Sequence, residues 1–320
     1  MSLLAFAAAL ALSGGDAADE PQACAREIIV LGAGQDAGAP QIGNFADNAP
    51  LLYPSSLGVI DRENGQRFVF DATPAITRQL AMLEEATRMD RTGPRALGLR
   101  IDGVFLTHAH IGHYLGLAYF GREAAGANAL PVFAMPRMAQ FLRDNGPWSQ
   151  LVTLGNIDLI EMEQGGFTIV SDDFGVLPIT VPHRDEYSET VGFIMMTPDK
   201  RALYVPDLDS WDEFAASSGG TLEELISGVD YAFIDATFWD DNELLDENGL
   251  GRDMSEIPHP RVTQTMDRLA ELPASEKAKV HFIHYNHTNP IRDPASEESA
   301  LVEARGFNVA RRGDRTCLSR

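Results

Sequence analysis

Basic residues are scarce in this chain, and no stretch is rich in them. The 320 residues include 25 Lys and Arg against 47 Asp and Glu, a formal net charge of −22 at pH 7. Such a chain should repel nucleic acid and anionic membrane surfaces, so we expect neither as a partner. We interpret this acidic protein as having a solvated, solubilising surface, and its hydrophobic content of 44% allows a substantial core.

Cysteines and long apolar runs are also scarce. Cys24 and Cys317 are the two cysteines, and neither lies in a motif with His or Asn, which argues against a cysteine nucleophile. The apolar run 3–12 is too short to span a bilayer, so we expect no membrane span. That run has the length of a signal-peptide core, although no Lys or Arg precedes Arg26.

These features favour an exported chain. We expect residues 1–23 to be a signal peptide or a disordered N-terminus, and residues 24–320 to form one domain. A periplasmic or secreted location follows, with a cytoplasmic location as the alternative. If the chain is exported, Cys24 and Cys317 could pair and tie its two ends together, although their spacing alone does not prove proximity.

Histidine is absent from the first 107 residues and then clusters. Three of the eight histidines fall in the segment Thr107-His108-Ala109-His110-Ile111-Gly112-His113. The apolar run 103–106 before them predicts a buried strand, and residues 113–125 predict a helix. A strand-to-helix turn with this spacing can aim several imidazoles at one point, and imidazole suits zinc, iron, copper and nickel.

Further metal-binding residue types end later apolar runs. His183 follows residues 175–182, Asp207 follows 202–206 and His284 follows 280–283. Side chains held at strand ends can converge on one rim with little freedom. The predicted metal ligands are therefore His108, His110, His113, His183, Asp207 and His284.

Strand and helix patterns alternate along the whole chain. Strands are predicted at 27–33, 67–72, 103–108, 131–135, 202–206, 231–235, 279–284 and, as the last strand, 307–311. The segments 157–163, 167–172, 177–182 and 190–197 predict an antiparallel meander. Helices are predicted at 75–89, 113–125, 136–145, 211–214, 222–227, 260–272 and 294–305. We expect β-rich layers covered by helices.

Several other site types find little support. The glycines of 32–34 follow a strand, but the next glycine comes one position late for a dinucleotide loop, and Pro40 stands where a helix should start. No Gly-x-Ser-x-Gly elbow occurs, which disfavours a serine hydrolase. The alternating acids of 207–212 lack the glycine and distal glutamate of a calcium loop. We interpret Asp209 and Asp212 as caps of a helix near Trp211.

The order of these residues resembles the metallo-β-lactamase superfamily. That family carries His-x-His-x-Asp-His, then a single His, an Asp and a final His, which match the turn 108–113 and then His183, Asp207 and His284. The resemblance spans roughly residues 27–311. It implies an α+β fold, a four-layer αββα sandwich with the metals between the sheet edges.

Longer segments look like the pyrroloquinoline quinone biosynthesis protein B branch of that superfamily. These segments are Val30-Leu31-Gly32-Ala33-Gly34, Gly38-Ala39-Pro40-Gln41, the run 235–243 (DATFWDDNE), Asn286-His287-Thr288-Asn289-Pro290 and the run 303–309 (EARGFNV). This chain departs from the pattern at Gly112, where the superfamily has an Asp that helps to hold a second metal. His287 stands where the branch has Asn, and it could be a replacement ligand, a substrate contact or a surface residue.

The resemblance implies a first metal on His108, His110 and His183. Asp207 would bridge to a second metal on His113 and His284, and we take Asp207 and His284 as the catalytic residues. Without a carboxylate at 112, this second site should be weaker or more open. We expect one or two zinc ions, with iron or manganese as the alternative. Asp71 and Asp235 could orient ligating histidines or simply cap turns, and Asp36 is a weaker candidate for the same role.

The expected activity is that of a metallo-hydrolase. Hydroxide made available by the metal would attack an ester, lactone, amide or phosphodiester centre in a small-molecule substrate. An Fe(II)-dependent oxygenase related to quinone biosynthesis is the alternative, and a non-catalytic metal-binding protein is the second. Weaker candidates for a substrate pocket, which core packing could equally explain, are Tyr114, Tyr187, Trp239 and His259. The substrate, the metal and the oligomeric state are left open.

Overall fold

The computed structural model describes residues 24–43, 47, 49–88, 100–245, 249–254 and 257–320. The predicted signal peptide, residues 1–23, lies outside the described residues. The strands are β1 Arg26–Gly32, β2 Ser56–Asp61, β3 Gln66–Phe70, β4 Gly103–Phe105, β5 Leu130–Ala134, β6 Ile157–Glu161, β7 Thr168–Ser171, β8 Phe174–Thr180, β9 Val191–Met196, β10 Arg201–Val205, β11 Tyr231–Asp235, β12 Val280–Ile283, β13 Asn308–Val309 and β14 Arg315–Ser319. The helices are α1 Ile76–Arg88, α2 Ile111–Tyr114, η1 Leu115–Phe120, α3 Pro136–Asp144, α4 Trp148–Thr153, α5 Trp211–Ser218, α6 Leu222–Ser227, α7 Val262–Arg268, α8 Ala274–Lys277, η2 Pro290–Arg292 and α9 Glu297–Ala304.

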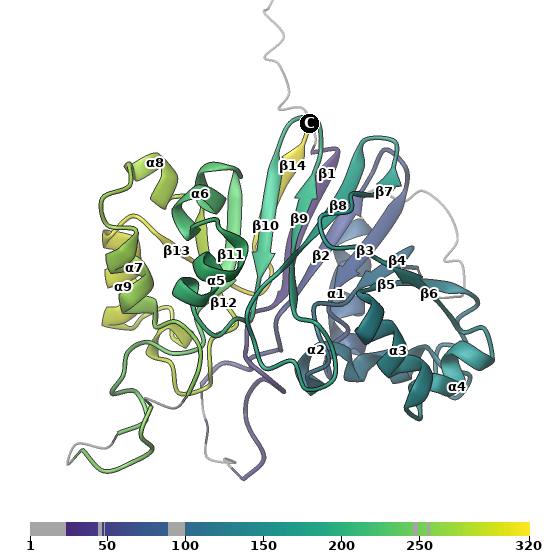
Figure 1. Cartoon of the computed structure of the whole chain (residues 1–320), viewed down its shortest axis with the longest axis horizontal. Coiled ribbons are helices and arrows are strands. Elements are labelled where there is room, and N and C mark those ends of the chain that lie inside the picture. The colour runs from purple at the N-terminus through teal and green to yellow at the C-terminus, as the bar shows by residue number, and fades with distance from the viewer. Residues whose placement is uncertain (1–23, 44–46, 48, 89–99, 246–248, 255–256) are drawn as a thin grey trace, which may run out of the picture.

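Two mixed sheets form the centre of the molecule. Their strand orders are β14-β1-β2-β3-β4-β5-β6 and β13-β12-β11-β10-β9-β8-β7. Helices α1–α4 lie beside the first sheet and α5–α9 beside the second (Figure 1). This arrangement confirms the predicted αββα sandwich of the α+β class. Among the described residues, no helix combines the length and the apolar character that a membrane crossing needs.

Aromatic side chains fill the space between the two sheets. The ring of Phe105 stacks between those of Phe70 and Phe133, with centroids 4.7 and 4.3 Å away, and meets Phe193 of the second sheet edge-on at 5.8 Å. All four side chains are buried. A separate apolar cluster under α1, η1, α3 and α4 holds those helices to the outer face of the first sheet.

Strand direction places the predicted site residues at one edge of the sandwich. Strands β3 to β6 are parallel to one another, and so are β10 to β13. Strand β8 also runs with β10, because each is antiparallel to β9. The carboxyl ends of these strands therefore meet at the same edge, and the residues that follow them form the candidate site.

Two of the predicted elements differ in the structure. The helix predicted at 113–125 begins at Ile111, tightens to a 3₁₀ helix and ends at Phe120. A Cβ at Gly116 would lie 2.2 Å from the carbonyl oxygen of Thr73, so this turn packs directly on backbone. The strand predicted at 157–163 also does not belong to the antiparallel meander. It forms β6, which pairs in parallel with β5 in the first sheet.

The sequence patterns missed β2, β14 and α4. Every residue of β2 is buried, so it shows no alternation, and its Gly58 makes room for Leu83 of α1. Strand β14 follows the predicted last strand and pairs with β1. A disulfide links Cys24, two residues before β1, to Cys317 of β14, so the two cysteines that could pair do so.

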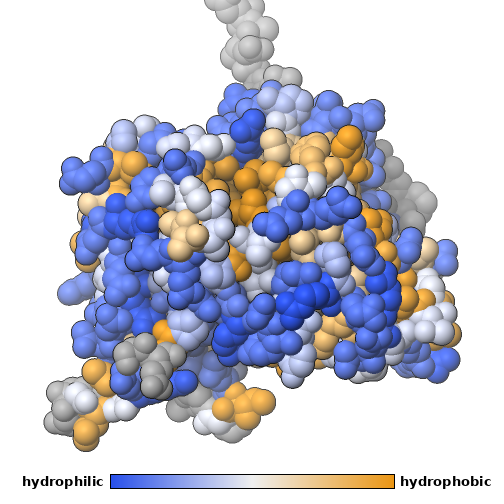
Figure 2. Space-filling view, in the orientation of Figure 1, coloured by the Kyte–Doolittle hydropathy of each residue, from blue (hydrophilic) through white to orange (hydrophobic). Residues whose placement is uncertain are grey.

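Hydrophilic residues cover most of the face shown in Figure 2. This agrees with the interpretation of a solvated surface. An apolar groove of about 260 Å³ lies at the surface between α6 and strands β8 and β9, with Leu177, Ile194 and Leu225 in its walls.

Candidate metal centre

Metal-binding side chains converge at the shared edge of the two sheets. Among the described residues, three groups offer ligand atoms that all lie within 4.8 Å of one another. The first group is His108, His110, His183 and Asp207, the second is His113, Asp207 and His284, and the third is Asp207, Asp235 and His259. Asp207 belongs to all three, so its carboxylate is the centre of the cluster.

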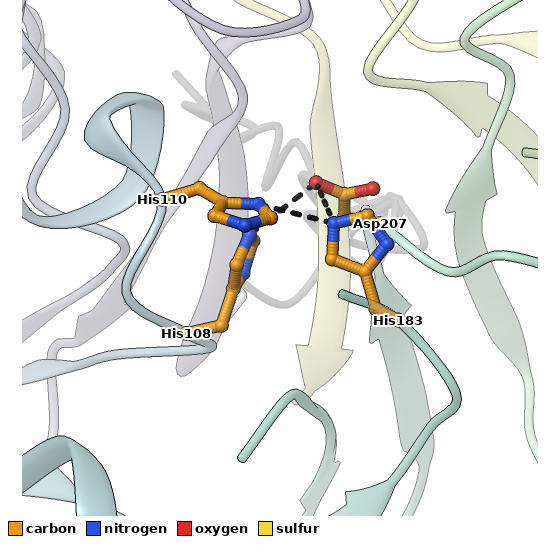
Figure 3. Close-up of side chains that lie close together, drawn as sticks. All are labelled: His108, His110, His183 and Asp207. Carbon is orange, nitrogen blue, oxygen red and sulfur yellow. Dashed lines mark hydrogen bonds and ion pairs between the residues drawn. The ribbon is translucent and has the colours of Figure 1, made fainter. Parts of the chain in front are cut away.

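The first group joins the turn after β4 to the ends of β8 and β10. Oδ2 of Asp207 lies 3.4 Å from Nε2 of His108 and 3.4 Å from Nε2 of His183. Nε2 of His183 is also 3.1 Å from Nδ1 of His110. Figure 3 shows the four side chains turned toward one another. Four converging donors of this kind match the usual coordination of zinc.

The second group lies on the other side of Asp207. Its Oδ2 is 3.7 Å from Nε2 of His113, which lies on α2, and 3.8 Å from Nε2 of His284, which follows β12. His284 has a φ of +65°, a left-handed conformation that an L side chain rarely adopts. The structure thus brings together all six predicted ligands, in two groups that share Asp207.

His259 is the member of the cluster that sequence reasoning placed elsewhere. It was predicted as a weak substrate-pocket residue, yet its buried ring has Nδ1 2.9 Å from Oδ2 of Asp235 and 3.2 Å from Oδ1 of Asp207. It sits in the loop before α7 rather than at a strand end, so the strand-end pattern could not identify it. Its φ of +95° shows a backbone held in an uncommon conformation.

Carboxylates and hydroxyls behind the cluster fix the imidazole rings. Oδ2 of Asp71 lies 2.8 Å from Nδ1 of His113, and Oδ1 of Asp209 lies 2.7 Å from Nδ1 of His183. Oγ1 of Thr107 lies 3.0 Å from Nδ1 of His108, and Oγ1 of Thr237 lies 3.0 Å from Nδ1 of His284. Such partners set the tautomer and orientation of a ligating histidine. The interpretation of Asp209 as a helix cap is wrong, since Ser210 caps α5.

Three buried atoms at the centre of the cluster have no hydrogen-bond partner. They are Nε2 of His108, Nε2 of His284 and Oδ1 of Asp207, the last of which has the ion-pair contact with Nδ1 of His259 but no hydrogen bond. An unsatisfied buried polar atom costs about 1–3 kcal/mol, so such atoms are uncommon unless they serve a bound group. Their chemistry, two imidazole nitrogens and a carboxylate oxygen, fits a divalent metal. The cluster therefore supports a metal site.

Burial and charge oppose each other within the cluster. Burial alone would raise the pKa of Asp207, but His183, His284 and His259 hold that pKa well below its usual range. Burial lowers the pKa of His108 well below its ordinary value. Burial also lowers the pKa of His259, but Asp235 and Asp207 outweigh it and raise that pKa to about 9. The neighbouring imidazoles thus favour the ionised form of Asp207 and burial favours the neutral form of His108, and these are the forms that bind metals.

Two cavities of about 300 Å³ each adjoin the cluster. His259, Asp209 and Arg268 line one of them, and His183, Glu189 and Ser217 line the other. Each is large enough for a small polar group rather than a macromolecule.

The remaining predicted site residues lie farther out. The half-buried ring of Tyr114 packs against Phe141 and Trp148, and the exposed Tyr187 packs against Phe141. Trp239 packs against the central core. His287 is outside the three groups, and its Nδ1 lies 2.7 Å from Oδ1 of Asn286.

Known proteins are similar to this chain in sequence and in fold. A model of the β-lactamase superfamily domain matches residues 66–284. Coenzyme PQQ synthesis protein B of Klebsiella pneumoniae is 27% identical over 311 residues, which cover 88% of this chain and 95% of that protein. The protein of the same name from Pseudomonas aeruginosa strain LESB58 is 37% identical over 312 residues, which cover 88% of this chain and 97% of that protein.

Solved structures show the same fold. Zn²⁺-bound PqqB from Methylobacterium extorquens superposes with a TM-score of 0.72 and 20% identity, covering 91% of this chain and 99% of that one. A diphosphatase of the PhnP family gives a TM-score of 0.58 with 19% identity, covering 91% of this chain and 96% of that one. The chain belongs to the β-lactamase superfamily and, within it, resembles the coenzyme PQQ synthesis protein B branch.

Proposed function

We propose that this protein is a metal-dependent hydrolase of a small molecule with an ester, lactone, amide or phosphodiester bond. The convergence of buried, unpartnered ligand atoms around Asp207 carries this proposal. The superfamily assignment supports it, and the two cavities beside the cluster suit a small substrate. Hydrolysis adds the hydroxyl of water to the electrophilic carbon or phosphorus and a proton to the leaving group.

A divalent metal, when bound, supplies Lewis acidity that makes hydroxide available near pH 7 and polarises the bond under attack. His108, His110, His183 and Asp207 would hold the first ion, and His113, Asp207 and His284 the second. We propose zinc at one or two ions per chain, because nitrogen and carboxylate donors suit zinc and a PqqB structure contains it. Iron and manganese are the alternatives.

The residues around the metal groups have distinct tasks. Asp71, Asp209 and Thr237 hold His113, His183 and His284 by their Nδ1 atoms, which keeps each Nε2 turned toward Asp207. His259 has its Nδ1 held by Asp235 and also lines a cavity. We propose that substrate enters this cavity and that His259 delivers the proton to the leaving group.

An Fe(II)-dependent oxygenase is a second candidate, and one observation favours it. The second group consists of two histidines and one carboxylate, the donor set of many non-haem iron sites that activate oxygen. The relatives named for PQQ synthesis make this worth testing. Oxygen consumed in step with substrate would support it, whereas metal binding without any turnover would support a non-catalytic role.

A substrate panel tests the proposed activity. Purified zinc-loaded protein is assayed on ester, lactone, amide and phosphodiester substrates, alongside His183→Ala and, as a matched control, His281→Phe. His281 packs on Phe233 away from the cluster. We expect turnover of one class by the wild type and the control, and none by His183→Ala. Equal turnover by all three proteins would refute the assignment.

We also propose export to the periplasm or the exterior. The disulfide between Cys24, just before the first strand, and Cys317 in the last strand supports this, because disulfides persist in oxidising compartments. Cell fractionation and N-terminal sequencing of the mature chain test it. A reduced protein found with its full N-terminus in the cytoplasm would contradict it.

A further inference from the structure

The second metal group has one ligand atom fewer than the first. His113, Asp207 and His284 provide three atoms against four in the first group. Nε2 of His284 is buried and unpartnered, so this side of the cluster is also built for a ligand. Zinc prefers four donors. Position 112 cannot provide the fourth, because it is a glycine.

A tight turn of the first long loop lies against this group. The turn spans Gln35 to Gly38 and is closed by the amide of Gly38, which donates to the carbonyl of Gln35 at 2.9 Å. The amide of Gln35 in turn donates to the carbonyl of Tyr285 at 3.0 Å, and the amide of Tyr285 donates to Ala33 at 3.0 Å. Because Tyr285 directly follows His284, these bonds fix the turn beside one ligand of the second group.

The same turn touches the helix that carries the other histidine. A Cβ at Gly112 would lie 2.5 Å from the carbonyl oxygen of Asp36 and 3.0 Å from its Cα. No side chain fits there, so glycine at 112 is what allows Asp36 to approach the residue before His113. Asp36 holds a left-handed φ of +49° at this contact.

Asp36 supplies the carboxylate of this turn, and its backbone lies directly against the residue before His113. The side chain of Asp36 is exposed and lies outside the three groups of ligand atoms, so it has to turn toward His113 and His284 to bind a metal there.

We propose that the carboxylate of Asp36 is an additional ligand of the metal held by His113, Asp207 and His284. This inference rests on the proposed function, since it needs that second metal. Gly112 then does more than leave the second site without a carboxylate, because the missing Cβ lets the backbone of another loop, which carries Asp36, approach the site. Carboxylate oxygen is an ordinary zinc ligand, at about 2.0–2.2 Å.

Zinc titration of the metal-free protein against a chromophoric chelator tests this. The variants are Asp36→Asn, which keeps the size and tolerates a left-handed φ, and Asp172→Asn as a control for an exposed acid on the distant β7–β8 turn. We expect Asp36→Asn to weaken the second zinc constant by about 10–100-fold while the first changes less than about twofold. Asp172→Asn should change neither constant.

A second pair of variants probes the space at 112. Gly112→Ala forces the turn away and should selectively weaken the second zinc. Gly220→Ala, where a new Cβ would meet no atom closer than 3.7 Å, should not. If Asp36→Asn left both zinc constants unchanged, or weakened both equally, the role of Asp36 would be overturned while the two-metal function would stand. A wild type that binds one zinc would instead overturn the two-metal function, and this inference with it.

Discussion

Asp71→Asn tests how the buried network controls the metal centre. Oδ2 of Asp71 lies 2.8 Å from Nδ1 of His113, and its Oδ1 accepts from the amide of Thr107 at 2.9 Å. An asparagine has one oxygen for these two donors, and its NH₂ group must face the other. If Thr107 keeps the oxygen, Nδ1 of His113 has to become an acceptor. The ring proton then moves to Nε2, the atom turned toward Asp207.

The size of the effect follows from that tautomer change. A protonated Nε2 cannot bind a metal, so the ring of His113 has to return to the other tautomer when the second ion binds. The free energy of that tautomer change weakens the binding. We expect second-zinc affinity to fall about 10–100-fold, the range for loss of a partner behind a ligand. This equals about 1.4–2.7 kcal/mol. Chelator competition measures it, and the first zinc constant should be nearly unchanged.

Asp61→Asn is the matched control. Asp61 is equally buried in the first sheet, but it pairs with Arg26 at 3.0 Å rather than with a histidine. We expect it to lower Tm without changing either zinc constant. If Asp71→Asn binds the second zinc like the wild type, the tautomer argument is refuted.

Three further predictions concern stability. Replacing both Cys24 and Cys317 by Ser removes a disulfide that links residues 293 positions apart, and it should lower the free energy of unfolding by about 5 kcal/mol. Urea denaturation under oxidising conditions measures this loss. An unchanged urea midpoint would contradict the prediction. Burial lowers the pKa of His281 to about 4, so the unfolded chain binds the extra proton first and stability falls as the pH drops from about 6.5 toward 4. His281→Phe should remove roughly 3 kcal/mol of this acid-induced loss in the free energy of unfolding, measured on metal-free protein by urea denaturation at a series of pH values. If stability against pH ran parallel for variant and wild type, this prediction would be refuted. Phe105→Ala should lower the free energy of unfolding by about 3–5 kcal/mol, because the Phe105 ring fills the space between Phe70 and Phe133. Tyr119→Ala at the surface should lower it by less than about 0.5 kcal/mol. Similar losses in the two variants would contradict this account of the core.

The predicted ligands were found because their positions obey a simple rule. His183, Asp207 and His284 each follow an apolar strand, and parallel strands bring their carboxyl ends to one edge. The sequence therefore predicts both the residues and their convergence. The αββα layers follow from the same alternation of strands and helices, together with the resemblance that the motif order carries.

What sequence reasoning missed depends on contacts between distant segments. His259 enters the cluster from a loop, through its contacts with Asp235 and Asp207. Asp209 contacts His183, although its spacing also fits a helix cap. Strand β2 is buried on both faces, so its pattern shows no period of two. In each case tertiary packing, which a local pattern does not contain, decided the outcome.

Metal content tests the central claim most directly. Elemental analysis of the purified mature chain, without added metal, is compared with Asp207→Ala, which removes the carboxylate common to all three groups. We expect one or two zinc ions per wild-type chain and a loss of metal in the variant. A wild type that holds no metal even after reconstitution, or a variant that retains the full complement, would contradict the assigned centre.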